Sequence, residues 1–191
     1  VNAIRVAYTG ELGWELHHPI EMQNYLWDRL LLAGPEYGLK LVGARAQNWL
    51  RQEKSYRAFG TELGRDATPL EADLSRFIDL EKEFLGKEGM ENTGVRAKCV
   101  TLLIDGPNGA DPWGREALYL ENGTKVGRLT SGGYSVVFNK SIGMGYIRPD
   151  LAQEGQKLKV KMLNSLWDAE VTCDSPYAVS YTHLTLPTSV T

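Results

Sequence analysis

Apolar and polar side chains alternate in two short runs near the start of the chain, over residues 4–8 and 14–17. A period of two is typical of a β-strand with one buried face, so both runs are predicted to be strands. Gly10 and Gly13 lie in the segment between them and interrupt the alternation. We therefore expect a strand–loop–strand element whose loop has positive φ at one or both glycines.

The hydrophobic period becomes helical over residues 21–33, where Met22, Leu26 and Leu30 fall on one face. The pair Gly34-Pro35 follows this run, and glycine and proline in succession are a typical helix stop. The pattern therefore predicts one helix that ends at residue 33.

A second helix is predicted over residues 43–57. Its apolar Trp49 and Leu50 are expected to face the core. Its charged Arg51 and Lys54 are expected to face water, because charged side chains are seldom buried.

The second half of the chain changes to short strands separated by turn residues. Asn122-Gly123 is a hairpin signal between two of them. The run Thr130–Gly133 is expected to form a turn between strands rather than an anion-binding nest. Six strands predict a small antiparallel β-barrel and, with the helices before it, an α+β fold; they cover residues 100–104, 118–120, 126–129, 141–147, 158–162 and 169–172.

The polar, glycine-punctuated stretch 86–94 is the candidate domain boundary. Residues 1–90 are predicted to be part of a domain whose N-terminal portion is missing, because the chain starts inside a strand pattern and without Met. Residues 95–177 are predicted to be a C-terminal β-barrel domain. Residues 178–191 are rich in Thr, Ser and Leu without a clear period, so we expect them to be a non-native tail.

The composition excludes several classes of protein but does not indicate a function. The 191 residues are 42% hydrophobic and 24% charged, which excludes a disordered chain and a disulfide-stabilised miniature scaffold. The net charge of −3 gives no electrostatic reason to expect nucleic acid or an anionic membrane as a partner. No apolar stretch approaches the roughly 20 residues of a transmembrane helix.

The metal-ligating residue types are few and scattered. Cys99 and Cys173 with three histidines do not complete the ligand spacing of a metal site, so none is expected. We expect Cys99 and Cys173 to be a reduced pair of small core residues. A Cys99–Cys173 disulfide is the alternative that stays open.

Residues 5–16 carry the most informative candidate chemistry. Their glycines lack the Gly-Lys-Ser/Thr of a phosphate loop. Glu15 is either a solvated charge on the polar side of a strand or a ligand for a planar heterocycle with two parallel N–H donors. In the second interpretation, Tyr8 stacks on a ring or donates its hydroxyl.

Several ordered motifs resemble the aminomethyltransferase (glycine cleavage T-protein) family, and most of all the C-terminal folate-binding region of dimethylglycine and sarcosine dehydrogenases. The resemblance covers roughly residues 4–177. It rests on Tyr8–Glu15, Gly43–Arg45, Leu50–Gly60, Thr68–Ala72, Thr130–Ser135 and Ile142–Ile147.

The resemblance implies that tetrahydrofolate binds in a central channel of this fold. It assigns the pterin edge to Glu15, a neighbouring tyrosine to Tyr8 and a channel-lining arginine to Arg45. The acidic catalytic residue of the family is expected upstream of Val1, so no catalytic residue is assigned in this chain. Three aspartates are expected to be caps and surface charges: Asp66, Asp73 and Asp79.

The preferred functional hypothesis follows from the resemblance. An upstream domain with FAD oxidises dimethylglycine or sarcosine, and this region presents tetrahydrofolate so that the oxidised methyl group is captured as 5,10-methylenetetrahydrofolate. The fragment alone is expected to be inactive. The implied location is the bacterial cytoplasm or, in a eukaryote, the mitochondrial matrix.

Two alternatives stay open. One is a stand-alone aminomethyltransferase of the glycine cleavage system, whose partner is a lipoyl carrier protein. The other is a non-catalytic folate-binding or structural module. Leu12-Gly13-Trp14 favours the dehydrogenase hypothesis, because the stand-alone enzyme usually has an acidic residue before the second glycine.

Overall fold

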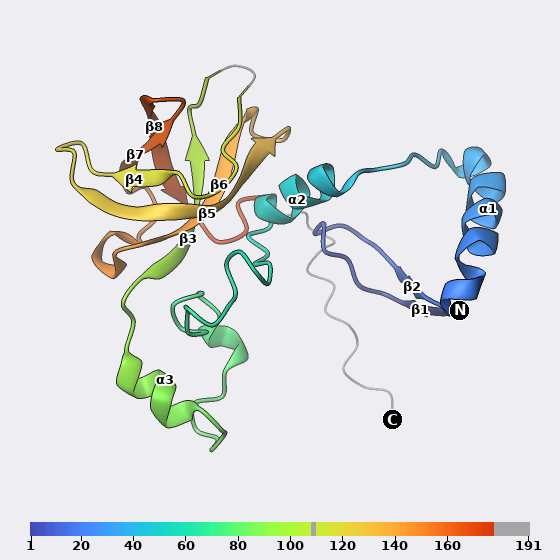
Figure 1. Cartoon of the computed structure of the whole chain (residues 1–191), viewed down its shortest axis with the longest axis horizontal. Helices are drawn as coiled ribbons and strands as arrows, with labels where there is room; N and C mark the ends of the chain where they lie inside the picture. Colours follow the sequence, from blue (N-terminus) through green and yellow to red (C-terminus); the bar gives the residue numbers. More distant parts are fainter. Residues whose placement is uncertain (108–109, 178–191) are drawn as a thin grey trace.

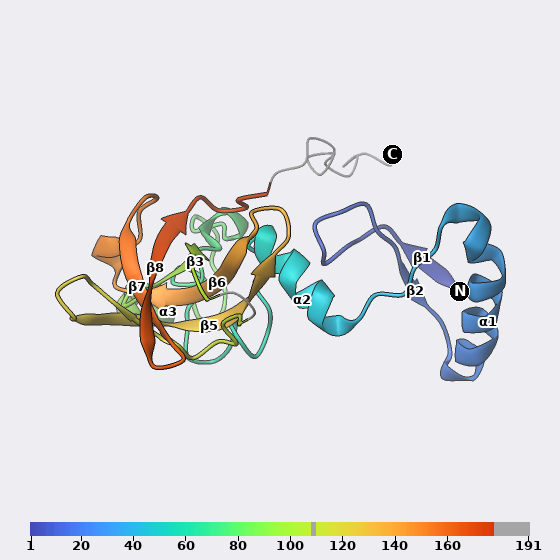
Figure 2. The ribbon, with the colours of Figure 1, turned by 90° about the horizontal axis from the view of Figure 1, so that it is seen from above.

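A computed structural model describes residues 1–107 and 110–177 of the chain. A β-barrel occupies one end of the molecule, and an N-terminal hairpin and helix lie at the other end (Figure 1). Seen from above, helix α2 lies between these two parts (Figure 2). The predicted tail, residues 178–191, falls outside the described residues.

The barrel is closed and antiparallel, with the strand order β3-β6-β5-β4-β7-β8. This confirms the predicted antiparallel barrel and the α+β class. The strands are β3 (Lys98–Ile104), β4 (Ala117–Tyr119), β5 (Lys125–Ser135), β6 (Lys140–Ile147), β7 (Lys157–Met162) and β8 (Ser165–Thr172).

The barrel interior is apolar because alternate residues of each strand point inward. Leu102 and Ile104 of β3, Leu118 of β4, Leu129 of β5 and Val160 of β7 are fully buried in one cluster. The short alternating runs that predicted the strands are thus the runs that fill the core.

The Thr130–Gly133 run lies inside β5, so the predicted turn is wrong. Its glycines serve close packing instead. A Cβ on Gly132 would lie 2.4 Å from the carbonyl oxygen of Pro112, and one on Gly133 would lie 2.1 Å from the Trp49 ring. Only glycine leaves room for these neighbours.

The N-terminal part contains a small hairpin of β1 (Asn2–Ile4) and β2 (Glu15–His17), paired antiparallel. β1 ends at Ile4, so the strand predicted to reach Tyr8 is too long, while Gly10 has the expected positive φ of 76°. The segment then continues through η1 (Ile20–Met22), α1 (Gln23–Ala33) and η2 (Gly34–Tyr37).

Helix α1 ends where the glycine–proline stop predicted, but none of its residues is buried. Large apolar side chains stay exposed along this part, among them Trp14, Ile20, Leu32 and Leu41. So many exposed large apolar side chains in one part of a chain are typical of a segment that contacts further polypeptide.

The middle of the chain connects the two parts through α2 (Ala44–Glu53), η3 (Ser75–Phe77) and α3 (Lys87–Thr93), and η4 (Pro149–Leu151) follows β6. Helix α2 packs on β5 and β6. No helix of the described ranges is long and apolar enough to cross a bilayer.

Glu71 joins the segment before α3 to the start of the barrel. Its carboxylate accepts hydrogen bonds from Arg96 Nε (2.8 Å) and from the backbone N–H of Thr68 (2.8 Å). Its carbonyl accepts from the backbone N–H of Cys99 (2.7 Å). The bond from Arg96 lowers the pKa of Glu71 from 4.5 to about 2.

This lowered pKa predicts an acid-sensitive contribution to stability. A carboxyl group whose pKa is lower in the folded state stabilises the fold above its unfolded pKa and loses that contribution as pH falls toward the folded value. The free energy of unfolding, measured with urea, should therefore fall between about pH 4.5 and pH 2. Glu71→Gln should be less stable at neutral pH and show a smaller acid slope. An acid slope equal to that of the wild-type chain would contradict the assignment.

Candidate functional site

The last turn of α2 brings polar side chains into the interior. Arg51, Gln52 and Glu53 are buried, and so are Lys54 and Ser55 directly after the helix. The prediction that Arg51 and Lys54 face water is therefore wrong, and the predicted helix end at residue 57 is four residues too late. The buried end of α2 makes its polar contacts with β5 and β3.

Arg51 and Glu62 form a buried ion pair at this contact. Arg51 Nη1 donates to Glu62 Oε2 at 2.8 Å, and both side chains are about 1% exposed. Arg51 also donates to the Tyr56 carbonyl (2.8 Å) and to Ser131 Oγ (2.6 Å). A buried pair of this kind is tolerated when further hydrogen bonds satisfy both charges.

The Glu62 carboxylate is satisfied from several sides. It accepts from the hydroxyls of Thr130 (2.6 Å) and Ser131 (2.5 Å) and from the backbone N–H of Ala58 (3.0 Å). Burial raises the pKa of a carboxyl group, but Arg51 and these donors outweigh burial, so the pKa of Glu62 lies below its usual value. Glu62 is thus held as an anion.

Two further buried contacts fasten the same end of the helix to the barrel. Ser135 Oγ donates to the Glu53 carboxylate, and the hydroxyls of Ser55 and Thr101 share a hydrogen bond of 2.7 Å. These contacts fix the position of α2 and, with it, of the residues at both of its ends.

Tyr8 lies against this anchored region. Its hydroxyl donates to the Arg57 carbonyl (3.1 Å), and its ring stacks on Tyr56 with the centroids 6.2 Å apart. Burial raises the pKa of Tyr8 above its usual value, although the nearby Arg51 charge opposes the shift. Gly10 of the same loop is buried, and a Cβ there would lie 2.0 Å from Lys54 Cγ.

Glu15 lies on β2, opposite Ile4 of β1. Its side chain is 55% exposed, and its Oε2 is 3.2 Å from His17 Nε2. None of the contacts described for Glu15 connects it to Tyr8 or Arg45. Both interpretations of Glu15, a solvated charge or a ligand, therefore remain predictions.

Arg45 lies in the first turn of α2. Its guanidinium stacks on the rings of Trp49 (5.2 Å to the centroid) and Trp113 (5.5 Å) and is 3.6 Å from the Asp111 carboxylate. The structure thus places Tyr8 and Arg45 at opposite ends of α2. Tyr8 contacts the segment directly after its C-terminal end, and Arg45 lies at its N-terminal end.

Sequence reasoning missed Glu62, Asp111 and Trp113. Glu62 lies in a loop with no periodic pattern, and Asp111 and Trp113 lie in a long connection between strands. The polar run Arg51–Ser55 could have indicated the buried polar contacts at the end of α2. Five polar residues in succession cover every side of a helix, so some of them must face the core.

The remaining candidates have structural roles in the described residues. Asp73 pairs with Arg57 and Lys98, which makes it an ion-pair partner, and Asp79 caps the backbone N–H of Glu81. Both cysteines are free; Cys99 is buried as expected for a core residue, whereas Cys173 is exposed. Within the described ranges, no group of three or more His, Cys, Asp or Glu could hold a metal ion.

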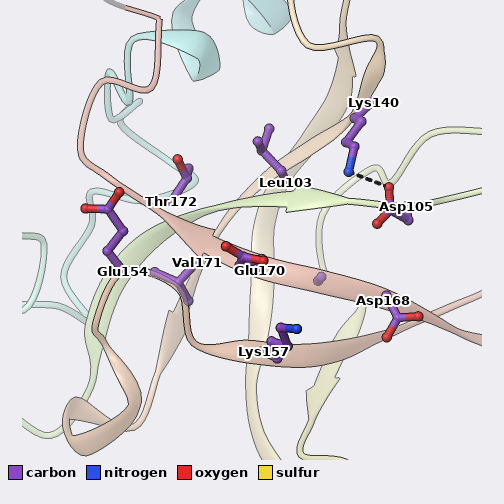
Figure 3. Close-up of a pocket in the computed structure, with 10 residues that line it drawn as sticks. Leu103, Asp105, Lys140, Glu154, Lys157, Asp168, Glu170, Val171 and Thr172 are labelled. Atoms are coloured by element: carbon purple, nitrogen blue, oxygen red, sulfur yellow. Dashed lines mark ion pairs between the residues drawn. The ribbon is translucent and has the colours of Figure 1, made fainter.

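A hollow of about 510 Å³ lies on the outside of the barrel, across β3 and β8 (Figure 3). Lys140 forms an ion pair with Asp105 on its wall (2.7 Å), and Lys157 lies among the acidic side chains of Asp168 and Glu170. Because acidic and basic groups are mixed, this hollow does not favour one ligand class.

The Arg51–Glu62 pair yields a prediction on stability. Arg51→Met should lower the free energy of unfolding by about 3–5 kcal/mol, because it leaves the Glu62 anion buried and unpaired. Arg51→Met with Glu62→Leu should recover part of the loss, since neither charge then remains. Urea unfolding of these two variants and of the single variant Glu62→Leu measures the coupling.

Arg148→Met is the matched control, because the Arg148–Asp150 pair is exposed and solvent screening leaves such a pair little effect on stability. Strictly additive effects of the Arg51 and Glu62 substitutions would contradict the coupling.

Comparisons with known proteins show what this chain is similar to. Residues 1–82 match the GCVT N-terminal domain, and residues 98–177 match the glycine cleavage T-protein C-terminal barrel domain. The chain is 40% identical over 180 residues to the mitochondrial dimethylglycine dehydrogenase of Homo sapiens, which covers 90% of this chain and 20% of that protein.

An aminomethyltransferase of Caldanaerobacter subterraneus is 35% identical over 181 residues, covering 93% of this chain and 48% of that protein. The crystal structure of glycine cleavage system aminomethyltransferase T from Bartonella henselae superimposes with a TM-score of 0.80 at 25% identity, covering 91% of this chain and 48% of that one. The chain thus spans about a fifth of the dehydrogenases and about half of the aminomethyltransferases that it matches.

Proposed function

The chain belongs to the glycine cleavage T-protein family, and on that premise we propose that it is the tetrahydrofolate-binding region of a dimethylglycine or sarcosine dehydrogenase. The observation that carries the proposal is the 40% identity to dimethylglycine dehydrogenase over 90% of the chain. Residues 1–90 then form part of the folate-binding domain, and residues 95–177 form its C-terminal barrel domain.

The chemical groups that the described residues offer fit a folate. A reduced pterin presents parallel N–H donors on one edge, flat faces for stacking, and a tail that ends in carboxylates. Glu15 offers an exposed carboxylate, Tyr8 and Trp49 offer aromatic faces, and Arg45 offers N–H donors. Each chemical feature of the ligand has a matching group.

In this function, Glu15 accepts two N–H donors of the pterin edge and so orients the ring, as a carboxylate does in a bidentate pair. Tyr8, fixed by Arg57 and Tyr56, limits the movement of the ring. Arg45 binds the carboxylates of the tail. The protein contributes positioning, which raises the effective concentration of the reacting groups.

Tetrahydrofolate, when bound, supplies the nucleophilic nitrogens that take up the one-carbon unit as 5,10-methylenetetrahydrofolate. A flavin domain elsewhere in the same protein is the partner that this function requires, and no catalytic residue is assigned to the present chain. The exposed apolar side chains of residues 1–43 support a contact of this kind, because they offer a surface for further polypeptide.

A second candidate is the stand-alone aminomethyltransferase, with a lipoyl carrier protein as its partner. The 35% identity to an aminomethyltransferase and the 0.80 TM-score favour it. It uses the same folate site, so the binding experiment below tests what the two candidates share. An assay of the whole protein for oxidation of dimethylglycine separates them.

Glu15→Gln should weaken tetrahydrofolate binding about 10- to 100-fold, because it removes the charge from a bidentate contact. Isothermal titration calorimetry of the whole protein that contains this chain measures the change. Glu21→Gln is the matched control, since Glu21 is also an exposed carboxylate of the N-terminal part and should leave the affinity unchanged. Equal affinities of Glu15→Gln and the wild-type chain would overturn the assignment of Glu15.

A further inference from the structure

The Arg45 guanidinium contacts two tryptophan rings that come from different parts of the chain. Trp49 is on the next turn of α2, and Trp113 is in the connection between β3 and β4. Asp111 of the same connection adds a carboxylate at 3.6 Å. The side chain of Arg45 is nevertheless 62% exposed, so this arrangement holds a charge at the surface rather than burying it.

Trp49 is held in place by β5. Its ring occupies the space that a Cβ on Gly133 would need, at 2.1 Å, and it meets the edge of the Tyr134 ring at a centroid distance of 6.4 Å. The rotamer of Trp49 is therefore restricted by the barrel itself.

Trp113 is 80% exposed, yet its backbone is closely fixed. Pro112 before it is buried against Gly132, where a Cβ would lie 2.4 Å from the Pro112 carbonyl oxygen. The Glu116 carboxylate accepts hydrogen bonds from the backbone N–H groups of Trp113 and Gly114, each at 2.9 Å. An exposed tryptophan on a backbone fixed at both sides points to a function other than core packing.

A cation–π contact uses the charge of a guanidinium and does not consume its N–H donors, which stay available for hydrogen bonds. Within residues 1–107 and 110–177, Arg45 has these two ring contacts and the Asp111 ion pair and donates no hydrogen bond. Trp49 and Asp111, which both contact Arg45, also line a cavity of about 540 Å³.

We propose that Asp111 and Trp113 of the barrel are positioning residues that hold Arg45 toward the anionic tail of the folate. The inference rests on the proposed function, since it concerns the same ligand. Neither residue touches the reacting atoms. They restrict the rotamers of Arg45 before the ligand arrives, so that less conformational entropy is lost when its carboxylates bind.

The test uses Trp113→Ala and the conservative Trp113→Phe, with two probes: tetrahydrofolate and 6-methyltetrahydropterin, which has the same ring but no carboxylates. Trp113→Ala should weaken tetrahydrofolate binding about fivefold, in line with the loss of one cation–π contact, and leave 6-methyltetrahydropterin unchanged. Trp113→Phe should restore most of the affinity. A merely structural role would weaken both probes alike.

Phe77→Ala is the matched control, because Phe77 is an exposed ring under Arg76 (5.0 Å) in a different part of the chain. Its affinity for both probes should equal that of the wild-type chain. Thermal unfolding should give the same midpoint for Trp113→Ala and wild type, since the ring is exposed.

Three results would overturn the inference. An unchanged tetrahydrofolate affinity of Trp113→Ala, beside a weakened Glu15→Gln, would reject the positioning role and leave the proposed function standing. Equal weakening of both probes by Trp113→Ala would also reject it. A whole wild-type protein, with this chain in its place, that binds neither probe would overturn the proposed function together with the inference.

Discussion

The buried ion pair between Arg51 and Glu62 is the constraint on which the rest of the structure depends. Burying two charges inside a protein costs several kcal/mol of desolvation for each charge. This cost is offset only when every donor and acceptor of the pair has a partner. The barrel supplies the missing partners through Ser131 and Thr130, so the pair is stable only when α2 is seated on β5. The need to satisfy these charges therefore decides where α2 lies.

The position of α2 in turn decides the geometry of the candidate site. Arg45 and Trp49 are on the same rigid helix, two turns or less before the ion pair, so they meet the barrel at a defined place. Tyr8 contacts the segment directly after the helix. Glu15 lies on the hairpin, and the partner that the structure describes for its carboxylate is His17 of the same strand.

The sequence pattern predicted the barrel well because strand periodicity is a local property. Several of the six runs alternate over a few residues, and their apolar positions, such as Leu102 and Val160, are the buried ones. The pattern failed at α2, where Arg51 and Lys54 were expected to face water. A charged residue is expected to be exposed only where the protein interior offers it no oppositely charged partner. The partner of Arg51 is Glu62, which lies in a loop without a periodic hydrophobic pattern, so the sequence did not reveal the pair.

By itself, the sequence determined the antiparallel barrel with most of its strands, the helix that ends at residue 33 and the family motifs that point to folate, because short-range spacing and residue identity encode all three. Only the tertiary structure decided that β5 continues through Thr130–Gly133, that an arginine and a glutamate share the interior, and that Arg45 lies over Trp113. These pairings join residues far apart along the chain. They arise from the competition among all the contacts a charged or aromatic group can make, and no local pattern records the outcome of that competition.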